Sequence, residues 1–127
     1  MLAVDTNVLV RLLARDDAKQ ALAADRAVAK GGWISLLVLA EAVWVLEAVY
    51  ARAPKQLIAA LDLLLIHESL VLQDADVVSV ALAQCRAKPT LGFSDCLVLE
   101  IARKAGHLPL ATFDKALAKL AGHRSCR

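Results

Sequence analysis

Four acidic residues stand inside otherwise apolar stretches of this 127-residue chain, at Asp5, Glu41, Asp95 and Asp114. An ionised carboxylate among apolar groups is strongly disfavoured unless another group pairs with it. Carboxylates brought together also repel one another, and a divalent cation is the simplest partner that neutralises them. Because the set contains no His or Cys, its oxygen donors favour Mg²⁺ or Mn²⁺ over zinc. The sequence therefore predicts a metal site held by these four residues.

Two of the acids also have ordinary structural explanations. Asp95 could be a favourable charge at a helix N-terminus, and Asp114 could cap the last helix. Glu41 is harder to explain in this way, because it lies within an apolar helical segment where no cap is needed. Asp5, which follows an apolar strand, presents the same difficulty. The occurrence of all four together favours a metal site over four separate structural roles.

Short apolar runs alternate with segments of helical spacing along the chain. Strands are expected at Leu2–Val4, Trp33–Ser35, Leu70–Leu72 and Leu108–Ala111. Helices are expected at Thr6–Ala14, Ala18–Ala29, Leu37–Ala51, Pro54–Ile66, Asp76–Lys88, Asp95–Ala105 and Asp114–Ala121. This alternation predicts an α/β fold, a three-layer α/β/α sandwich with a short, mostly parallel central sheet. A helical bundle is the competing fold, and the β-type runs at Trp33 and Leu70 argue against it.

The expected topology brings the four acids to one edge of the sheet. Asp5 lies at the carboxyl end of the first strand and Asp114 just beyond the last one, where open parallel sheets place their ligand crevices. Asp95 opens a helix aimed at the same edge, with Ser94 as its cap. Glu41 lies in the first or second turn of the helix that leaves the second strand. We therefore expect the four side chains to converge.

Length and composition fit a single domain covering residues 1–127. Charged residues break the apolar runs before they reach the length of a membrane span, and no basic segment precedes the N-terminal apolar residues. We therefore expect a cytoplasmic protein with no membrane segment. Cys85, Cys96 and Cys126 show no metal-type spacing and are expected to be packing residues.

Hydrophobic residues make up 59% of the sequence and the mean hydropathy is +0.57, which is high for a small soluble chain. Some apolar surface is therefore expected to meet another subunit. The segment Pro54–Ile66, apolar on nearly all sides, is the expected face of a homodimer. Trp33 and Trp44 are expected in the core. Residues 103–127 carry six Lys or Arg and one Asp, which suits a polyanion such as nucleic acid, although a solvated helix face explains any single charge equally well.

With these residues in place, the chain resembles the PIN-domain family of metal-dependent ribonucleases, and within it the small toxins of VapBC-type toxin–antitoxin systems. The resemblance covers nearly the whole chain. It rests on four motifs in order: Val-Asp5-Thr-Asn7, the run from Ile-Ser35 to Glu41, Phe-Ser-Asp95, and Leu-Ala-Thr112-Phe-Asp114. It implies a PIN-like fold in which Asp5, Glu41, Asp95 and Asp114 are the catalytic metal ligands and Asn7, Ser35 and Thr112 are supporting polar groups.

The resemblance also implies an activity and partners. One or two Mg²⁺ or Mn²⁺ ions would activate a water for attack on an RNA phosphodiester. The substrate would be single-stranded or loop RNA, and a cognate antitoxin would bind the toxin. Basic residues such as Arg11, Arg15, Lys115 and Lys119 could hold the RNA backbone. Many relatives flank the third acid with small residues, whereas Cys96 follows Asp95 here. The sequence therefore does not determine the packing beside Asp95, and binding of a soft metal through Cys96 is an open alternative.

Two other interpretations remain open beside this one. An aspartyl-phosphate or receiver-like phosphotransfer domain also places an Asp at the end of its first strand, but Asn7 occupies the position where a second Asp is usual. A catalytically silent PIN-like module that binds RNA or protein is the other, and a pure scaffold has no evident reason to keep four acids. RNA degradation that depends on a divalent metal would distinguish them.

Overall fold

The computed structural model describes residues 1–120 and 124–125, with burial described for residues 1–120. Contacts divide the chain into two compact units, Met1–Ala75 and Asp76–Arg127, and each is described by itself. Cys126 and the expected end of the last helix at Ala121 lie outside the described residues. Among the described helices, none combines the length and apolar character that crossing a bilayer needs.

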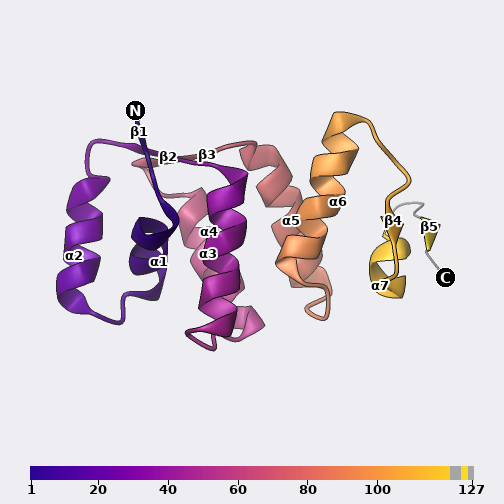
Figure 1. Cartoon of the computed structure of the whole chain (residues 1–127), viewed down its shortest axis with the longest axis horizontal. Coiled ribbons are helices and arrows are strands. Elements are labelled where there is room, and N and C mark those ends of the chain that lie inside the picture. Colours follow the sequence, from indigo (N-terminus) through magenta and orange to yellow (C-terminus); the bar gives the residue numbers. More distant parts are fainter. Residues whose placement is uncertain (121–123, 126–127) are drawn as a thin grey trace. The chain divides into compact units, whose positions relative to one another are not determined.

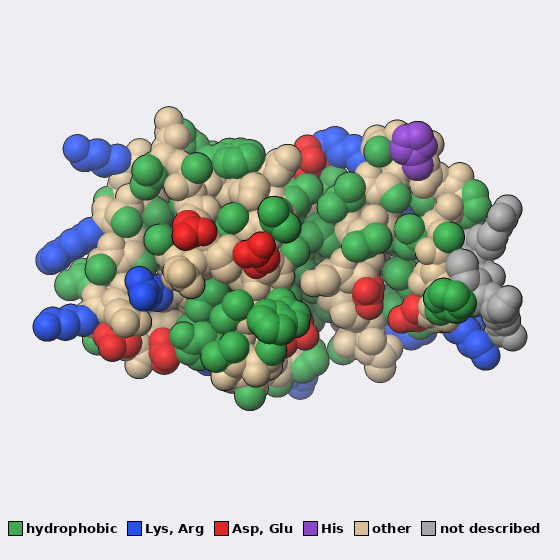
Figure 2. All heavy atoms as spheres, in the orientation of Figure 1, with side chains coloured by type: hydrophobic (Ala, Val, Ile, Leu, Met, Phe, Trp, Pro, Cys, Tyr) green, Lys and Arg blue, Asp and Glu red, His purple; other side chains and the backbone are tan. Residues whose placement is uncertain are grey.

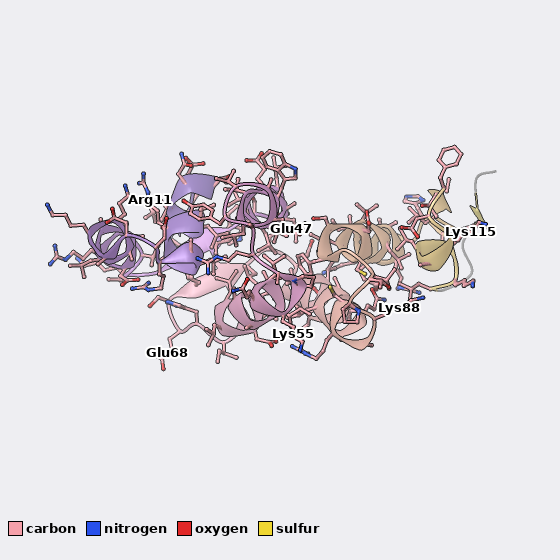
Figure 3. All side chains as sticks on the ribbon, turned by 90° about the horizontal axis from the view of Figure 1, so that it is seen from below. Arg11, Glu47, Lys55, Glu68, Lys88 and Lys115 are labelled. Atoms are coloured by element: carbon pink, nitrogen blue, oxygen red, sulfur yellow. The ribbon has the colours of Figure 1, made fainter. Side chains whose placement is uncertain are left out.

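The first unit is built on a short parallel sheet. Its strands β1 (Leu2–Ala3), β2 (Gly32–Ile34) and β3 (Leu70–Leu72) lie in the order β1-β2-β3. The helices α1 (Thr6–Ala14), α2 (Ala18–Ala27), α3 (Leu36–Ala48) and α4 (Pro54–Leu65) connect these strands (Figure 1). Figure 3 shows α1 and α3, with Arg11 and Glu47, on one side of this unit and α4, with Lys55, on the other. The expected α/β fold with a short parallel sheet is confirmed.

The middle strand of the sheet takes glycine at a position with no room for a side chain. Gly32 pairs with Leu2 on one side and with Leu70 on the other. A Cβ at this position would stand 2.7 Å from Cγ2 of Val4 and 3.1 Å from Cδ2 of Leu70. The close approach fixes β1 against β2, and β1 leads directly to Asp5.

Apolar stripes of the helices close over the sheet of the first unit. Fully buried side chains come from each layer and include Leu9, Ile34, Leu39, Val43 and Leu61. Burying a side chain of this kind contributes roughly 1.5–3 kcal/mol, so this set holds α1, α3 and α4 against the strands. Helix α4 buries only one stripe of its apolar side chains. Leu63 on the helix and Ile66 directly after it are exposed to solvent.

The second unit contains two long helices followed by short elements. These are α5 (Ala75–Ala87), α6 (Phe93–Ala105), β4 (Ala111–Thr112), α7 (Lys115–Ala118) and β5 (Arg124–Ser125). Cys85 and Cys96 are both buried, as expected of packing residues, and Sγ of Cys85 donates to the backbone carbonyl of Leu91 at 3.2 Å. Glu100 is buried as well, and its carboxylate accepts hydrogen bonds from Nε2 of Gln84 and Nε of Arg103, each at 2.9 Å.

The C-terminal part of the chain differs from the prediction in two places. The strand expected at Leu108–Ala111 in the main sheet is instead β4, which pairs in parallel with β5 in a separate two-stranded sheet. Helix α6 begins at Phe93 rather than Asp95, with Gly92 as its N-cap and without a side-chain cap. Ser94 therefore lies inside the helix, because the buried ring of Phe93 belongs to the helical face.

Candidate metal centre

Asp5 lies at the N-terminus of α1, immediately after β1. Its Oδ1 accepts a hydrogen bond from the backbone N–H of Thr6 at 2.7 Å, and the strand itself ends at Ala3. An acidic N-cap is favourable because it satisfies an unpaired backbone donor and faces the positive end of the helix dipole. The Asp5 side chain is exposed, so the expectation that it lies buried among apolar groups is wrong.

Glu41 lies in the second turn of α3, and two side chains hold the start of that helix. Oγ of Ser35 accepts from the backbone N–H of Val38 at 3.1 Å, and Oε1 of Gln73 accepts from the N–H of Leu36 at 2.9 Å. Both satisfy donors that a helix N-terminus leaves unpaired. Ser35 therefore supports the site by fixing the helix that carries Glu41. Glu41 is exposed, contrary to the expectation of an apolar surrounding.

A threonine hydroxyl joins the two acids of the first unit. Oγ1 of Thr6 donates to Oε2 of Glu41 at 2.9 Å, while the backbone N–H of the same residue is bound by Asp5. We call these three residues the Asp5–Thr6–Glu41 cluster. Sequence reasoning missed Thr6, although a hydroxyl residue directly after an acid at a helix start is a usable signal. Asn7 is exposed and, within residues 1–120, makes no side-chain hydrogen bond that would support the acids.

The second unit carries the other two acids, each near a helix start. Asp95 lies in the first turn of α6, with Oδ2 turned back over Gly92, 3.4 Å from the position a Cβ would take there. Asp114 is the N-cap of α7, and its Oδ1 accepts from the N–H of Leu117 at 3.0 Å. Oγ1 of Thr112 accepts from the backbone N–H of Asp114 at 3.0 Å. Thr112 thus fixes the backbone of this acid rather than its carboxylate.

A buried thiol lies close to both of these acids. Burial raises the pKa of the Cys96 thiol to about 11, and the charges of Cys85, Asp95, Glu100 and Asp114 act in the same direction. The thiol stays protonated near neutral pH, which disfavours capture of a soft metal through Cys96. Figure 2 shows acidic side chains near one another over the start of α6 and over α7.

Each unit thus supplies two exposed carboxylates, and in the first unit Thr6 hydrogen-bonds to both of them. Within either unit, the described residues contain no group of three or more His, Cys, Asp or Glu side chains placed to hold a metal. Convergence of all four acids therefore stays a prediction. The donors do fit a hard divalent ion, because they are carboxylate oxygens on exposed side chains and one oxygen of Asp5 and one of Glu41 remain without a hydrogen bond within residues 1–120.

One of the expected RNA-contacting cations is already paired. Nη1 and Nη2 of Arg15 donate to the two carboxylate oxygens of Asp25, each at 2.8 Å. The guanidinium beside Asp25 holds the pKa of that carboxyl below its usual value through the hydrogen bond and the opposite charge. This pair lines a 310 Å³ cavity with apolar residues of α1 and α4, and neither Asp5 nor Glu41 belongs to the lining. Arg11, Lys115 and Lys119 are exposed.

Comparison with known proteins places this arrangement in a family. Residues 2–123 match the model of the PIN domain. Among solved structures, VapC20 of Mycobacterium tuberculosis, a toxin that cleaves the sarcin–ricin loop, is similar with 20% sequence identity and a TM-score of 0.43; the match covers 100% of this chain and 99% of that one. No curated protein matches significantly. Because the family model spans all four acids and both units, the chain belongs to the PIN-domain family.

Proposed function

We propose that this chain is a metal-dependent endoribonuclease, acting as the toxin of a VapBC-type toxin–antitoxin pair. The observation that carries the proposal is the Asp5–Thr6–Glu41 cluster, in which two carboxylates from separate elements share one threonine. Membership in the PIN-domain family supports the same activity. The two units would together form one domain over residues 1–127, with Asp95 and Asp114 completing the set of acids.

In this proposal the four acids hold one or two Mg²⁺ or Mn²⁺ ions. When bound, such an ion supplies an activated water and neutralises charge that develops on the phosphate. Water attacks phosphorus, the bond from phosphorus to the leaving ribose oxygen breaks, and that oxygen takes up a proton. The protein needs no side-chain nucleophile for this hydrolysis.

The residues of the chain orient the ligands. Thr6 fixes the rotamer of Glu41, Ser35 and Gln73 fix the helix that carries it, and Thr112 fixes the turn that carries Asp114. Groups that orient metal ligands in this way commonly change metal affinity or activity by about 10- to 100-fold when they are lost. The amide of Asn7, two residues after Asp5, is exposed. It would contact the bound metal or the RNA rather than hydrogen-bond to the carboxylates.

The partners follow from the same proposal. The substrate is RNA, and a cognate antitoxin protein covers the acidic site. The exposed side chains of Leu63 on α4 and of Ile66 directly after it support a homodimer through this segment, and light scattering that gives a monomer mass at micromolar concentration would exclude it. The proposed location is the cytoplasm, where RNA is available.

The test is RNA degradation by purified protein with Mg²⁺ or Mn²⁺, with and without excess chelator. Asp5→Asn and Glu41→Gln should each reduce cleavage by at least about tenfold, since each removes a charged ligand. The matched controls Asp16→Asn and Glu47→Gln remove exposed acids outside the cluster and should leave cleavage unchanged. Cleavage that persists in excess chelator, or that both cluster variants retain, would contradict the proposal.

A further inference from the structure

The aromatic side chains of this chain divide by exposure. Of the two Trp, one Tyr and two Phe, Phe93 is 3% exposed, Trp33 is 37% exposed and Tyr50 is partly buried. The side chain of Trp44 is 65% exposed and that of Phe113 is 81% exposed. The expectation that Trp33 and Trp44 lie in the core is therefore wrong, and the two most exposed rings, Trp44 and Phe113, need another explanation.

Trp44 borders the Asp5–Thr6–Glu41 cluster. It lies three residues after Glu41 on α3, and side chains at this spacing are neighbours on one helix face, with Cβ atoms roughly 5–6 Å apart. Leu37, one turn before Glu41, is also exposed on this face. Figure 2 shows hydrophobic side chains beside acidic ones over α3. The indole is thus placed next to a proposed ligand of the metal within the same unit.

Phe113 holds the corresponding position in the second unit. It stands between Thr112 and Asp114, whose hydrogen bond at 3.0 Å fixes the turn around it. Although Thr112 is partly buried and Leu117 fully so, the ring of Phe113 points to solvent. Each unit therefore carries one strongly exposed ring beside one of its proposed catalytic acids.

The position of these exposed rings beside the acids suits contact with a nucleobase and is not explained by random exposure of apolar side chains. The carboxylates repel phosphate until a cation neutralises them, so base stacking adds an attraction for RNA that does not depend on the charge of its backbone. Stacking of a base on an aromatic side chain contributes about 1–3 kcal/mol per base and requires the base to be unstacked from its neighbours. Trp and Phe offer such faces without hydrogen-bonding selectivity.

We propose that Trp44 and Phe113 each stack on a base of single-stranded RNA whose phosphodiester lies at the carboxylates. The inference rests on the proposed function and adds to it two residues that position the RNA by stacking on its bases. Because paired bases cannot be stacked on both rings, duplex RNA should be a poor ligand. Because the rings have no selective polar contacts, the preference for base identity should be weak at these two positions.

Binding can be read directly from the indole. Trp33→Phe leaves Trp44 as the single tryptophan, and Asp5→Asn in the same chain prevents cleavage during the titration. Adding a single-stranded oligoadenylate in Mg²⁺ buffer should quench the fluorescence of Trp44, and a duplex of the same length should quench it much less. Trp44→Leu in the Asp5→Asn chain should weaken oligonucleotide binding by about 5- to 150-fold, which corresponds to one lost stack.

Conservative variants separate stacking from bulk. Trp44→Phe and Phe113→Tyr keep an aromatic face and should retain most of the affinity, whereas Trp44→Leu and Phe113→Leu should not. Leu22→Ala removes an exposed apolar side chain on α2, outside the proposed site and the proposed dimer face, and serves as the control, with no change expected. The same variants in the otherwise wild-type chain should change KM for single-stranded RNA more than kcat.

The outcomes are distinguishable from failure of the proposed function. If wild-type protein cleaves RNA but Trp44→Leu and Phe113→Leu bind and cleave as well as wild type, without quenching of Trp44, the inference is wrong and the nuclease stands. If those variants keep RNA affinity but no longer bind the antitoxin, the rings are a protein contact and the inference is equally wrong. If wild-type protein neither binds nor cleaves RNA with either metal, the proposed function itself fails.

Discussion

The hydroxyl of Thr6 donates a 2.9 Å hydrogen bond to Oε2 of Glu41, across a separation of 35 residues in the sequence. It connects the N-terminus of α1 with the second turn of α3, which α1 packs against. Because Asp5 binds the backbone N–H of the same threonine, one residue orients two acids. This relationship gives the first unit a preformed pair of oxygen donors.

Replacement of Thr6 by valine should therefore impair the site without unfolding the protein. The variant keeps the shape of the side chain but loses the donor, so Glu41 can leave the orientation it has beside Asp5. We expect metal affinity or RNA cleavage to fall about 10- to 100-fold, while Thr6→Ser retains most of it. Thr90→Val, an exposed threonine without a described bond, is the control. Equal activity of Thr6→Val and wild type would show that the bond has no positioning role.

Gly32→Ala should destabilise the first unit. The added Cβ meets Cγ2 of Val4 at 2.7 Å, so the Val4 side chain or its backbone must move, and the Leu70 side chain, at 3.1 Å, must give slightly. Overpacking of this kind lowers the free energy of unfolding by about 1–3 kcal/mol, which denaturant unfolding measures. At Gly92, with φ of −68°, a Cβ would meet only the Asp95 carboxylate at 3.4 Å, so Gly92→Ala should change stability less. An unchanged unfolding midpoint for Gly32→Ala would mean that the strands are not packed this closely.

Arg15→Gln should raise the pKa of Asp25 toward its ordinary value. In the wild type, the hydrogen bond and the charge of Arg15 lower this pKa. A carboxyl whose pKa is lowered on folding stabilises the native state above its unfolded-state pKa, and this contribution disappears as the pH falls through the native pKa. The stability difference between wild type and variant should therefore vanish in acid. Carbon NMR of the carboxyl group measures the pKa directly, and an Asp25 pKa identical in both proteins would refute the pairing.

The sequence was most informative where a local signal sets an element. Helix α1 begins and ends at the expected residues, and β3 coincides with Leu70–Leu72. Hydrogen bonds between neighbouring residues decide such features, so one chain is enough to read them. The last strand could not be placed in this way. It pairs with β5, and the short polar sequence of β5 carries no apolar pattern that would predict a strand.

The candidate site was harder to predict because it depends on which helix face is exposed. Helix α3 is apolar almost all round, so its periodicity does not reveal that Glu41 and Trp44 face solvent while Leu39 and Val43 are buried. Burial was therefore the wrong reason to single out these four acids, since all of them are exposed. The motifs did identify acids near helix starts and strand ends. There Asp5 and Asp114 cap their helices, and Glu41 accepts a hydrogen bond from Thr6.

We propose that Asp5 and Asp95 are ligands of the same metal. Titration calorimetry with Mn²⁺ tests it most directly, on wild type, Asp5→Asn, Asp95→Asn and the double variant, with Asp16→Asn as control. One shared site predicts that each single variant loses most of the binding and that the double variant loses little more, because interacting ligands are not additive. Losses of Mn²⁺ binding free energy that add independently in the double variant would contradict a shared metal. So would the absence of Mn²⁺ binding by the wild type even with RNA bound.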